Sequence, residues 1–321
     1  MKALTVARKE IADQMSSNKF LVVFGLLLLL TAATSFQGAK SYQDSMDRFQ
    51  EAQNSENRIY APDKPSVLDA FNTLTRGVNF PLVGGLLALI LSFNTVSGER
   101  DRNTLKLLTS YPLHRDSIIN GKFMAGIFTL TLASAASFLT ASGIIISLTG
   151  ATVTAEAATR IVLMLGGTVL YMSVMYGLGT LLSTLFKRSS SALMGGVLIL
   201  TTFGLIVPQM SFFVADLMVE ESDEGVSTPG QGVSESFKKR MDIQSSIRKA
   251  APSGSYTHFM SYMMGQDPTE ISVSRGNGDG PKSEPSIGES LNSSLGVLGL
   301  LFGELVALFG ASYVLFTRQE I

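Results

Sequence analysis

The stretch FLVVFGLLLLLTAATSF, residues 20–36, contains no charged side chain and includes five consecutive leucines. A helix of roughly 20 apolar residues crosses the hydrocarbon core of a bilayer, and about 17 residues is the lower limit. The segment that precedes it, residues 1–19, is too long and too mixed in charge for the basic start of a secretory signal peptide. The stretch therefore predicts a first transmembrane helix.

Five more apolar runs of similar length follow along the chain. They cover residues 78–96, 123–148, 157–186, 191–213 and 295–316. Composition agrees with membrane insertion, because 45% of the residues are hydrophobic and only 16% are charged, whereas soluble domains average about 25% charged residues. The sequence predicts an all-α membrane protein with six transmembrane helices, placed as a multi-pass protein in the cell membrane.

Composition also excludes several kinds of chemistry. The chain has no cysteine and two histidines, His114 and His258, which excludes disulfides, a thiol nucleophile, Cys-ligated zinc and a His-rich metal site. A net charge of −1 without a basic stripe gives no basis for nucleic-acid binding. Phosphate-binding loops and hydrolase motifs are absent from the sequence. We therefore expect a chain that is not an enzyme and binds no cofactor or metal.

The distribution of Lys and Arg predicts the orientation in the membrane. Short basic segments lie before the first run, between the second and third, between the fourth and fifth, and after the last, whereas residues 149–156 carry no Lys or Arg. By the positive-inside rule, residues 1–19, 97–122 and 317–321 are cytoplasmic, and both termini lie inside. Residues 37–77 and 214–294 then form two extracytoplasmic inserts. Arg160, near the outer end of the fourth run, is expected to extend its head group to the membrane surface.

Several helices are expected outside the apolar runs. Leu4, Ala7, Ile11 and Met15 follow helical spacing, which predicts an amphipathic helix on the inner membrane surface; the alternative is a solvated extension. Residues 41–55 and 235–249 have few helix breakers, and APSGSYTHFMSYMMG, residues 251–265, predicts a short helical turn beside the membrane. Paired glycines in the apolar runs predict close helix packing, and Pro208 predicts a kink in the fifth run or the end of its regular part.

Residues 97–123, SGERDRNTLKLLTSYPLHRDSIINGKF, join the second run to the third. They contain Gly-Glu-Arg, Thr-Leu, a leucine-rich turn, Ser-Tyr-Pro-Leu-x-Arg, and Gly-Lys-Phe at the start of the next run. This order resembles the type-2 ABC exporter permease family. The resemblance continues in ARKE (7–10), APSGSYTHFM (251–260) and YVLFTRQEI (313–321), so it covers the whole chain in order, apart from an expanded outer insert. It departs at Asn103, where the family usually has glycine.

The resemblance implies the transmembrane subunit of an ABC exporter. Two copies, as a homodimer, or one copy and a relative, would pair with two cytoplasmic ATPase subunits that bind ATP and Mg. It also implies that the segment starting at Glu99 supplies a coupling helix that docks on the ATPase, with the N-terminal helix as a second contact. The expected coupling residues are Glu99, Arg100, Thr104, Leu105, Leu107, Leu108, Tyr111 and Pro112. The expected second-contact residues are Leu4, Arg8 and Ile11.

The residues of this segment support that assignment independently. Leu105 and Leu108 form an apolar knob, and Pro112 ends the short helix that carries it. Exposed leucines on the cytoplasmic side are costly unless something covers them. Membrane head groups would cover them, but a protein partner fits better. The alternative is a plain charged loop.

Glu304 is the acidic residue deep inside an apolar run. Such residues are expensive in lipid, so it marks either a substrate or proton site or a paired structural contact to another helix. Two other functions remain open. One is a component of an ABC-driven assembly or mechanotransmission complex that recruits an external protein through residues 214–294. The other is an ion-coupled transporter, which requires activity without ATP that is lost in Glu304→Gln.

Overall fold

The computed structural model describes residues 2–54, 64–76, 79–101, 115–219, 235–266 and 285–318, apart from the side chains at positions 2, 79 and 235. Every regular element in these ranges is helical, which confirms the predicted all-α class. The elements are α1 (Lys2–Met15), α2 (Asn18–Asn54), η2 (Val67–Phe71), α3 (Asn72–Arg76), η3 (Asn79–Gly84), α4 (Gly85–Ser92), α5 (Ser97–Asp101), α7 (Arg115–Thr149), α8 (Ala155–Leu185), α9 (Ser189–Thr201), η4 (Thr202–Ile206), α10 (Val207–Met218), α11 (Glu235–Lys249), α12 (Pro252–Met263) and α13 (Ile287–Arg318).

Five helical stretches among the described residues are long and apolar enough to cross a membrane. They are α2, α7, α8, the continuous stretch Ser189–Met218, and α13. A sixth span results if Val67–Arg76 and Phe80–Ser92, which meet at a bend of 43°, are counted together. This bent pair contains most of the second predicted run. Several helices extend beyond their apolar runs, and α2 continues as far as Asn54, which includes nearly all of the helix predicted for residues 41–55.

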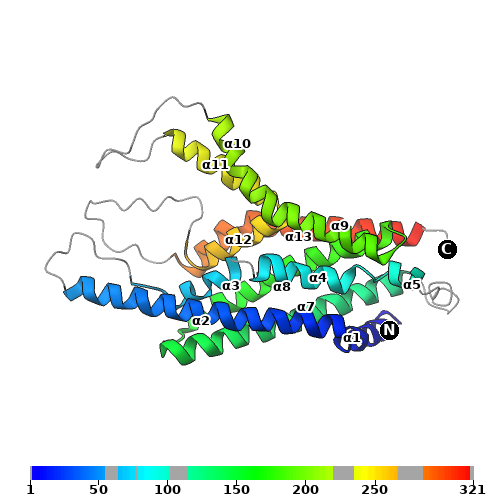
Figure 1. Ribbon diagram of the computed structural model, residues 1–321, viewed down its shortest axis with the longest axis horizontal. Helices are drawn as coiled ribbons and strands as arrows, with labels where there is room; N and C mark the ends of the chain where they lie inside the picture. The colour runs from blue at the N-terminus through cyan, green and yellow to red at the C-terminus, as the bar shows by residue number, and fades with distance from the viewer. Residues whose placement is uncertain are drawn as a thin grey trace.

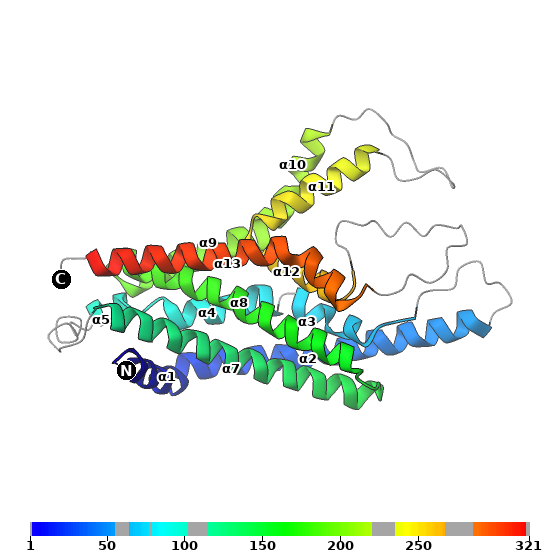
Figure 2. The same cartoon turned by 180° about the vertical axis from the view of Figure 1, so that it is seen from behind.

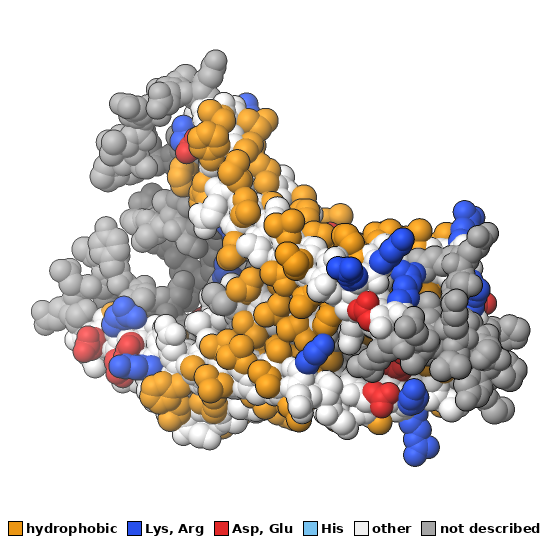
Figure 3. Space-filling view, turned by 45° about the vertical axis from the view of Figure 1, so that its right-hand side comes forward, with side chains coloured by type: hydrophobic (Ala, Val, Ile, Leu, Met, Phe, Trp, Pro, Cys, Tyr) orange, Lys and Arg blue, Asp and Glu red, His pale blue; other side chains and the backbone are white. Residues whose placement is uncertain are grey.

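The long helices α2, α7, α8 and α13 run along a common direction (Figures 1 and 2). α1, α5 and the last turn of α13 lie at one end of the bundle, which we call the termini end, whereas α3 and α12 lie toward the opposite end. On one face, an orange band of hydrophobic side chains crosses the middle of the molecule, and several Lys and Arg side chains gather beside it (Figure 3). An apolar band bordered by basic groups is the arrangement expected of a membrane-embedded bundle.

α8 lies at the centre of the bundle and packs against α4, α7, α12 and α13. More than half of its most apolar stretch is buried. Tyr171 and Tyr176 on this helix are fully buried, and their hydroxyls donate to the carbonyls of Pro81 (2.5 Å) and Lys122 (3.1 Å). Buried hydroxyls need such partners because an unpaired polar group in an apolar interior is costly.

The paired glycines of the apolar runs divide into packed and open positions. Gly179 and Gly167 lie so close to Ser92 and Phe259 that a β-carbon would overlap those side chains. A β-carbon on Gly196 would lie 3.1 Å from Leu89, whereas one on Gly166 would meet nothing within 4 Å. Helices therefore approach closely at one glycine of each such pair, which confirms the predicted packing role for those positions.

The fifth apolar run bends at a stretch of π-helix. η4 directly precedes α10, whose second residue is Pro208. Proline has no amide hydrogen, and its ring clashes with the carbonyl four residues earlier, so the wider turn accommodates it. Beyond this point α10 leaves the bundle together with α11 (Figures 1 and 2), and Arg240 of α11 pairs with Asp216 of α10 at 3.0 Å. The predicted kink at Pro208 and the predicted helix over residues 235–249 are both confirmed.

α12 differs from the helical turn that the sequence predicts beside the membrane. It is a helix of 12 residues, and nine of them are buried. It packs between α8, α13 and the bent pair, with Tyr256 donating to or accepting from Thr168 at 3.1 Å. The buried position could not be predicted from the sequence, because Ser, Gly, Tyr and His give the segment a polar composition. Their burial depends on partners from distant helices.

Candidate functional site

α5 begins on a buried cluster of hydroxyl groups at the termini end. The Ser183 hydroxyl oxygen accepts hydrogen bonds from the amides of Val96 and Ser97, each at 3.0 Å. The Ser97 hydroxyl in turn donates to the Ser189 hydroxyl at 3.1 Å. These bonds satisfy backbone donors at the start of a helix, where no intrahelical partner exists. They fix the Gly-Glu-Arg segment to the ends of α8 and α9.

The charged residues of α5 tighten the same attachment. Arg100 donates to the carbonyls of Thr184 (3.3 Å) and Phe186 (3.4 Å) at the end of α8. The Asp101 carboxylate accepts from the amide (3.1 Å) and the hydroxyl (2.6 Å) of Ser189. Both bonds favour the ionised form, so they hold the pKa of Asp101 below its ordinary value of 3.8. This attachment is therefore fully charged at neutral pH.

Glu99 faces a different helix. Its carboxylate lies 3.5 Å from the Lys122 ammonium of α7, and Glu10 of α1 contacts the same ammonium at 2.6 Å. The Lys122 side chain is only 6% exposed. Three separate elements, α1, α5 and α7, therefore meet around one buried cation.

α1 packs against the start of α7. A β-carbon on Gly121 would lie 2.7 Å from both the Ala3 carbonyl oxygen and the Val6 β-carbon, so the two helices touch at this glycine. Ala7 is buried, whereas Leu4 is 67% exposed. The predicted helix is confirmed, and its position on the membrane surface stays a prediction.

The predicted ATPase-contact residues are only partly visible. Glu99 and Arg100 are placed as described above, and Leu4 and Arg8 are exposed on α1, with Ile11 half-buried beside them. The other six predicted coupling residues lie within residues 102–114, outside the described residues: Thr104, Leu105, Leu107, Leu108, Tyr111 and Pro112. The described part of the site therefore consists of the residues that flank segment 102–114, together with α1.

Sequence reasoning did not single out Lys122 and Glu10 as site residues. Both belong to short motifs that carry the family resemblance, ARKE before the first run and Gly-Lys-Phe before the third, and Glu99 belongs to Gly-Glu-Arg. The opposite charges of these residues, each in a motif of the same family, were a signal from which their contact could have been predicted. The pairing itself depends on how α1 docks, which no local pattern specifies.

Comparison with known proteins identifies the family of the chain. A model of the ABC-2 family of transporter proteins matches residues 4–321. The chain belongs to this family. It is also similar to the probable ABC transporter permease protein NosY of Pseudomonas aeruginosa, with 27% identity over 144 residues. That alignment covers 45% of this chain and 46% of the relative. The protein is therefore a multi-pass membrane protein of the ABC-2 transporter family.

Glu304 lies on α13, within its apolar part. The residue is partly buried, and one of its carboxylate oxygens has no hydrogen-bond partner among the described residues. α13 packs against α8, and Leu301, three residues before Glu304, is buried. No described neighbour forms a salt bridge with it, so no relay of charged groups emerges around it. Its role stays a prediction.

Arg160 is buried rather than extended to the membrane surface. The residue is 1% exposed. Its guanidinium pairs with Glu156 (3.1 Å) and donates to the Met263 carbonyl (3.0 Å), the Ser290 hydroxyl (3.2 Å) and the Pro285 carbonyl. The expectation of snorkelling is wrong because the ends of α12 and α13 fold over α8 and supply acceptors that the sequence did not reveal.

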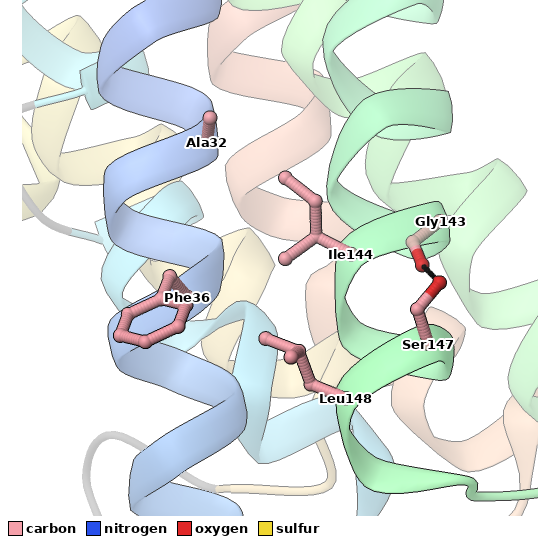
Figure 4. A pocket seen from close by; sticks show the side chains of 6 residues that line it. All are labelled: Ala32, Phe36, Gly143, Ile144, Ser147 and Leu148. Atoms are coloured by element: carbon pink, nitrogen blue, oxygen red, sulfur yellow. Dashed lines mark hydrogen bonds between the residues drawn. The ribbon is translucent and has the colours of Figure 1, made fainter.

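A cavity of about 430 Å³ opens between α2 and α7. It is lined by Ala32, Phe36, Gly143, Ile144, Ser147 and Leu148. Figure 4 shows that these side chains come from two facing helices and that the Ser147 hydroxyl bonds back to the Gly143 carbonyl, at 2.6 Å. The hydroxyl is thereby satisfied within its own helix. The cavity offers an apolar surface without acid, base or metal ligand.

Proposed function

We propose that the protein is the membrane subunit of an ABC exporter whose ATP hydrolysis takes place on a separate cytoplasmic protein. In this proposal two copies of the permease form a homodimer and bind two ATPase subunits, which hold ATP and Mg. The termini end faces the cytoplasm. The permease contributes no catalytic group and binds no cofactor, and its task is to convert movement of the ATPases into rearrangement of its helices.

The observation that carries this proposal is the attachment at both ends of residues 102–114. On the N-terminal side, Arg100 and Asp101 bind the ends of α8 and α9. On the C-terminal side, Arg115 at the start of α7 donates to the Thr317 carbonyl near the end of α13, at 3.3 Å. A force applied to the intervening segment would reach four membrane helices directly. A merely solvated loop has no need of such anchors.

We assign the ATPase contact to Glu99, Arg100 and the segment that follows them. Thr104, Leu105, Leu107, Leu108, Tyr111 and Pro112 form its docking part. The exposed residues Leu4 and Arg8 of α1 form a second contact on the same end, with Ile11 beside them. An apolar docking knob flanked by charges matches the usual anatomy of a protein interface, in which an apolar core is surrounded by a polar rim.

The decisive experiment is co-expression of the permease with its ATPase subunit. The double variant Leu105→Asp/Leu108→Asp places two charges in the proposed apolar contact. We expect it to stay in the membrane, to lose co-purification of the ATPase, and to lose the effect of the permease on the ATPase rate. The matched control Leu105→Met/Leu108→Met keeps an apolar surface of similar volume and should behave as the unchanged protein. Normal coupling in the aspartate variant would show that the contact lies elsewhere.

A further inference from the structure

A buried lysine at the termini end is shared by two carboxylates from different parts of the chain. Lys122 of α7 is 6% exposed, and its ammonium lies 2.6 Å from Glu10 of α1 and 3.5 Å from Glu99 of α5. The carboxylates are themselves largely buried, with 18% and 23% of their side chains exposed. This is an internal ion cluster rather than a surface salt bridge.

The packing around Lys122 joins the same elements a second time. The neighbouring Gly121 lets α1 approach α7 so closely that Val6 and Ala3 touch the helix there. The Lys122 carbonyl accepts a hydrogen bond from Tyr176 of α8 at 3.1 Å, and Gln14 of α1 donates to the same tyrosine hydroxyl at 3.5 Å. Lys122 is thus the point at which α1, α5, α7 and α8 come together.

Electrostatics explains why these elements stay together. A buried charge is tolerated only when it is paired, and removal of one partner leaves the others desolvated without compensation. Moving α1 away from α7 would break the pair with Glu10, and moving α5 away would break the pair with Glu99. Either separation is costly, because only 6% of the lysine side chain is exposed and little water can replace the lost carboxylate.

We propose that Lys122 is a positioning residue that makes α1 and α5 move as one unit with the start of α7. This inference rests on the proposed function, in which α1 and the segment after α5 are the two ATPase contacts. Because Lys122 connects them, a displacement of either α1 or α5 moves both elements. The same displacement moves the start of α7 and so reaches the membrane helices. The two contacts therefore act as a single input instead of two independent ones.

The connection that Lys122 makes between α1 and α5, which we call the tie, is tested by a distance measurement that needs no ATPase. The chain has no cysteine, so spin labels attach only to cysteines introduced at exposed positions, Ala12→Cys on α1 and Arg188→Cys beside α5. We expect one narrow distance distribution in the unchanged protein and in Lys122→Arg, which keeps the charge. Lys122→Met should broaden it. The control Lys9→Met removes a lysine that is 72% exposed and should leave the distribution narrow.

Coupling is tested with the complete complex of permease and ATPase in vesicles. The measured quantity is the ratio of the ATPase rate with and without the permease. Lys122→Met should reduce this ratio about fivefold or more, within the usual range of interaction energies for residues of one network, and Lys122→Arg should restore most of it. A purely structural role would lower the amount of folded permease without changing the ratio per folded molecule.

Variants of the two carboxylates test the proposal most sharply. They also replace Lys122→Met if that variant fails to fold. Because both carboxylates pair with one lysine, Glu10→Gln and Glu99→Gln should each broaden the distance distribution measured without ATPase, and the double variant should be no worse than the worse single variant. Multiplied effects in the double variant, or a Lys122→Met protein with an unchanged distance distribution and ratio, would overturn the proposal. Failure of the proposed function is distinct, since the unchanged permease would then not alter the ATPase rate while the distance measurement would still report the tie.

Discussion

At the scale of single residues, Arg160 connects three helices at the end of the bundle opposite the termini end. The residue is almost fully buried, and its guanidinium binds groups from α8, from the end of α12 and from the start of α13. Arginine suits this position because its planar group offers five donors in a fixed arrangement. A lysine has three donors around one nitrogen, so it would satisfy fewer of these acceptors.

Replacing Arg160 with leucine should therefore destabilise the protein strongly. The change leaves buried acceptors unpaired, at about 1–3 kcal/mol each, so we expect a total loss of about 3 kcal/mol or more. The measurement is thermal unfolding in detergent, followed by helical circular dichroism. The matched control is Arg48→Leu on the exposed part of α2, where the arginine bonds, among the described residues, to groups of its own helix. Equal melting temperatures for the two variants would contradict the role assigned to Arg160.

At the scale of elements, α12 is held where glycine lets two helices touch. Phe259 of α12 lies against Gly167 of α8, and Tyr256 bonds to the adjacent Thr168. The same element is held at its end by Gln266, which accepts from Arg76 at 2.7 Å and donates to Asp69 at 3.2 Å. These contacts fix α12 between α8 and the bent pair of the second span.

Adjacent glycines of α8 allow a closely matched test of this packing. Gly167→Ala introduces a methyl group against the Phe259 ring and should destabilise the protein by about 1–3 kcal/mol through overpacking. Gly166→Ala adds the same group where nothing lies within 4 Å, so it should be neutral or stabilising by up to about 1 kcal/mol through helix propensity. Chemical labelling of a cysteine introduced in α12 reports its displacement. If both alanines have the same effect, the contact between α8 and α12 is not a constraint on the fold.

At the scale of the whole molecule, short segments with basic residues meet at the termini end. Arg8, Arg100, Arg188 and Arg318 belong to four separate segments of the chain, and the helices bring these segments to the termini end. α11, with Lys239 on its exposed side, leaves the bundle in the other direction. The positive-inside rule counts short segments, so it predicts that the termini end lies inside the cell.

The orientation is tested by labelling single cysteines in intact cells. A maleimide that does not cross membranes should label Lys239→Cys directly, and should label Arg188→Cys only after the membrane is permeabilised. The unchanged chain has no cysteine and provides the background control. The reverse labelling pattern would invert the topology and remove the cytoplasmic location on which the ATPase contact depends.

The sequence by itself determined the class of protein, the number of long apolar segments and the order of the family motifs. These features follow from local composition, because about 20 apolar residues select a membrane helix wherever they occur. It also located the kink at Pro208 and the helix over residues 235–249, which depend on nearby residues alone. Only the tertiary structure decided that Arg160 is buried, that α12 lies inside the bundle, and that Glu10, Lys122 and Glu99 meet. Each of these depends on a partner more than 80 residues away along the chain, and the charge or polarity of one residue does not specify where such a partner will lie.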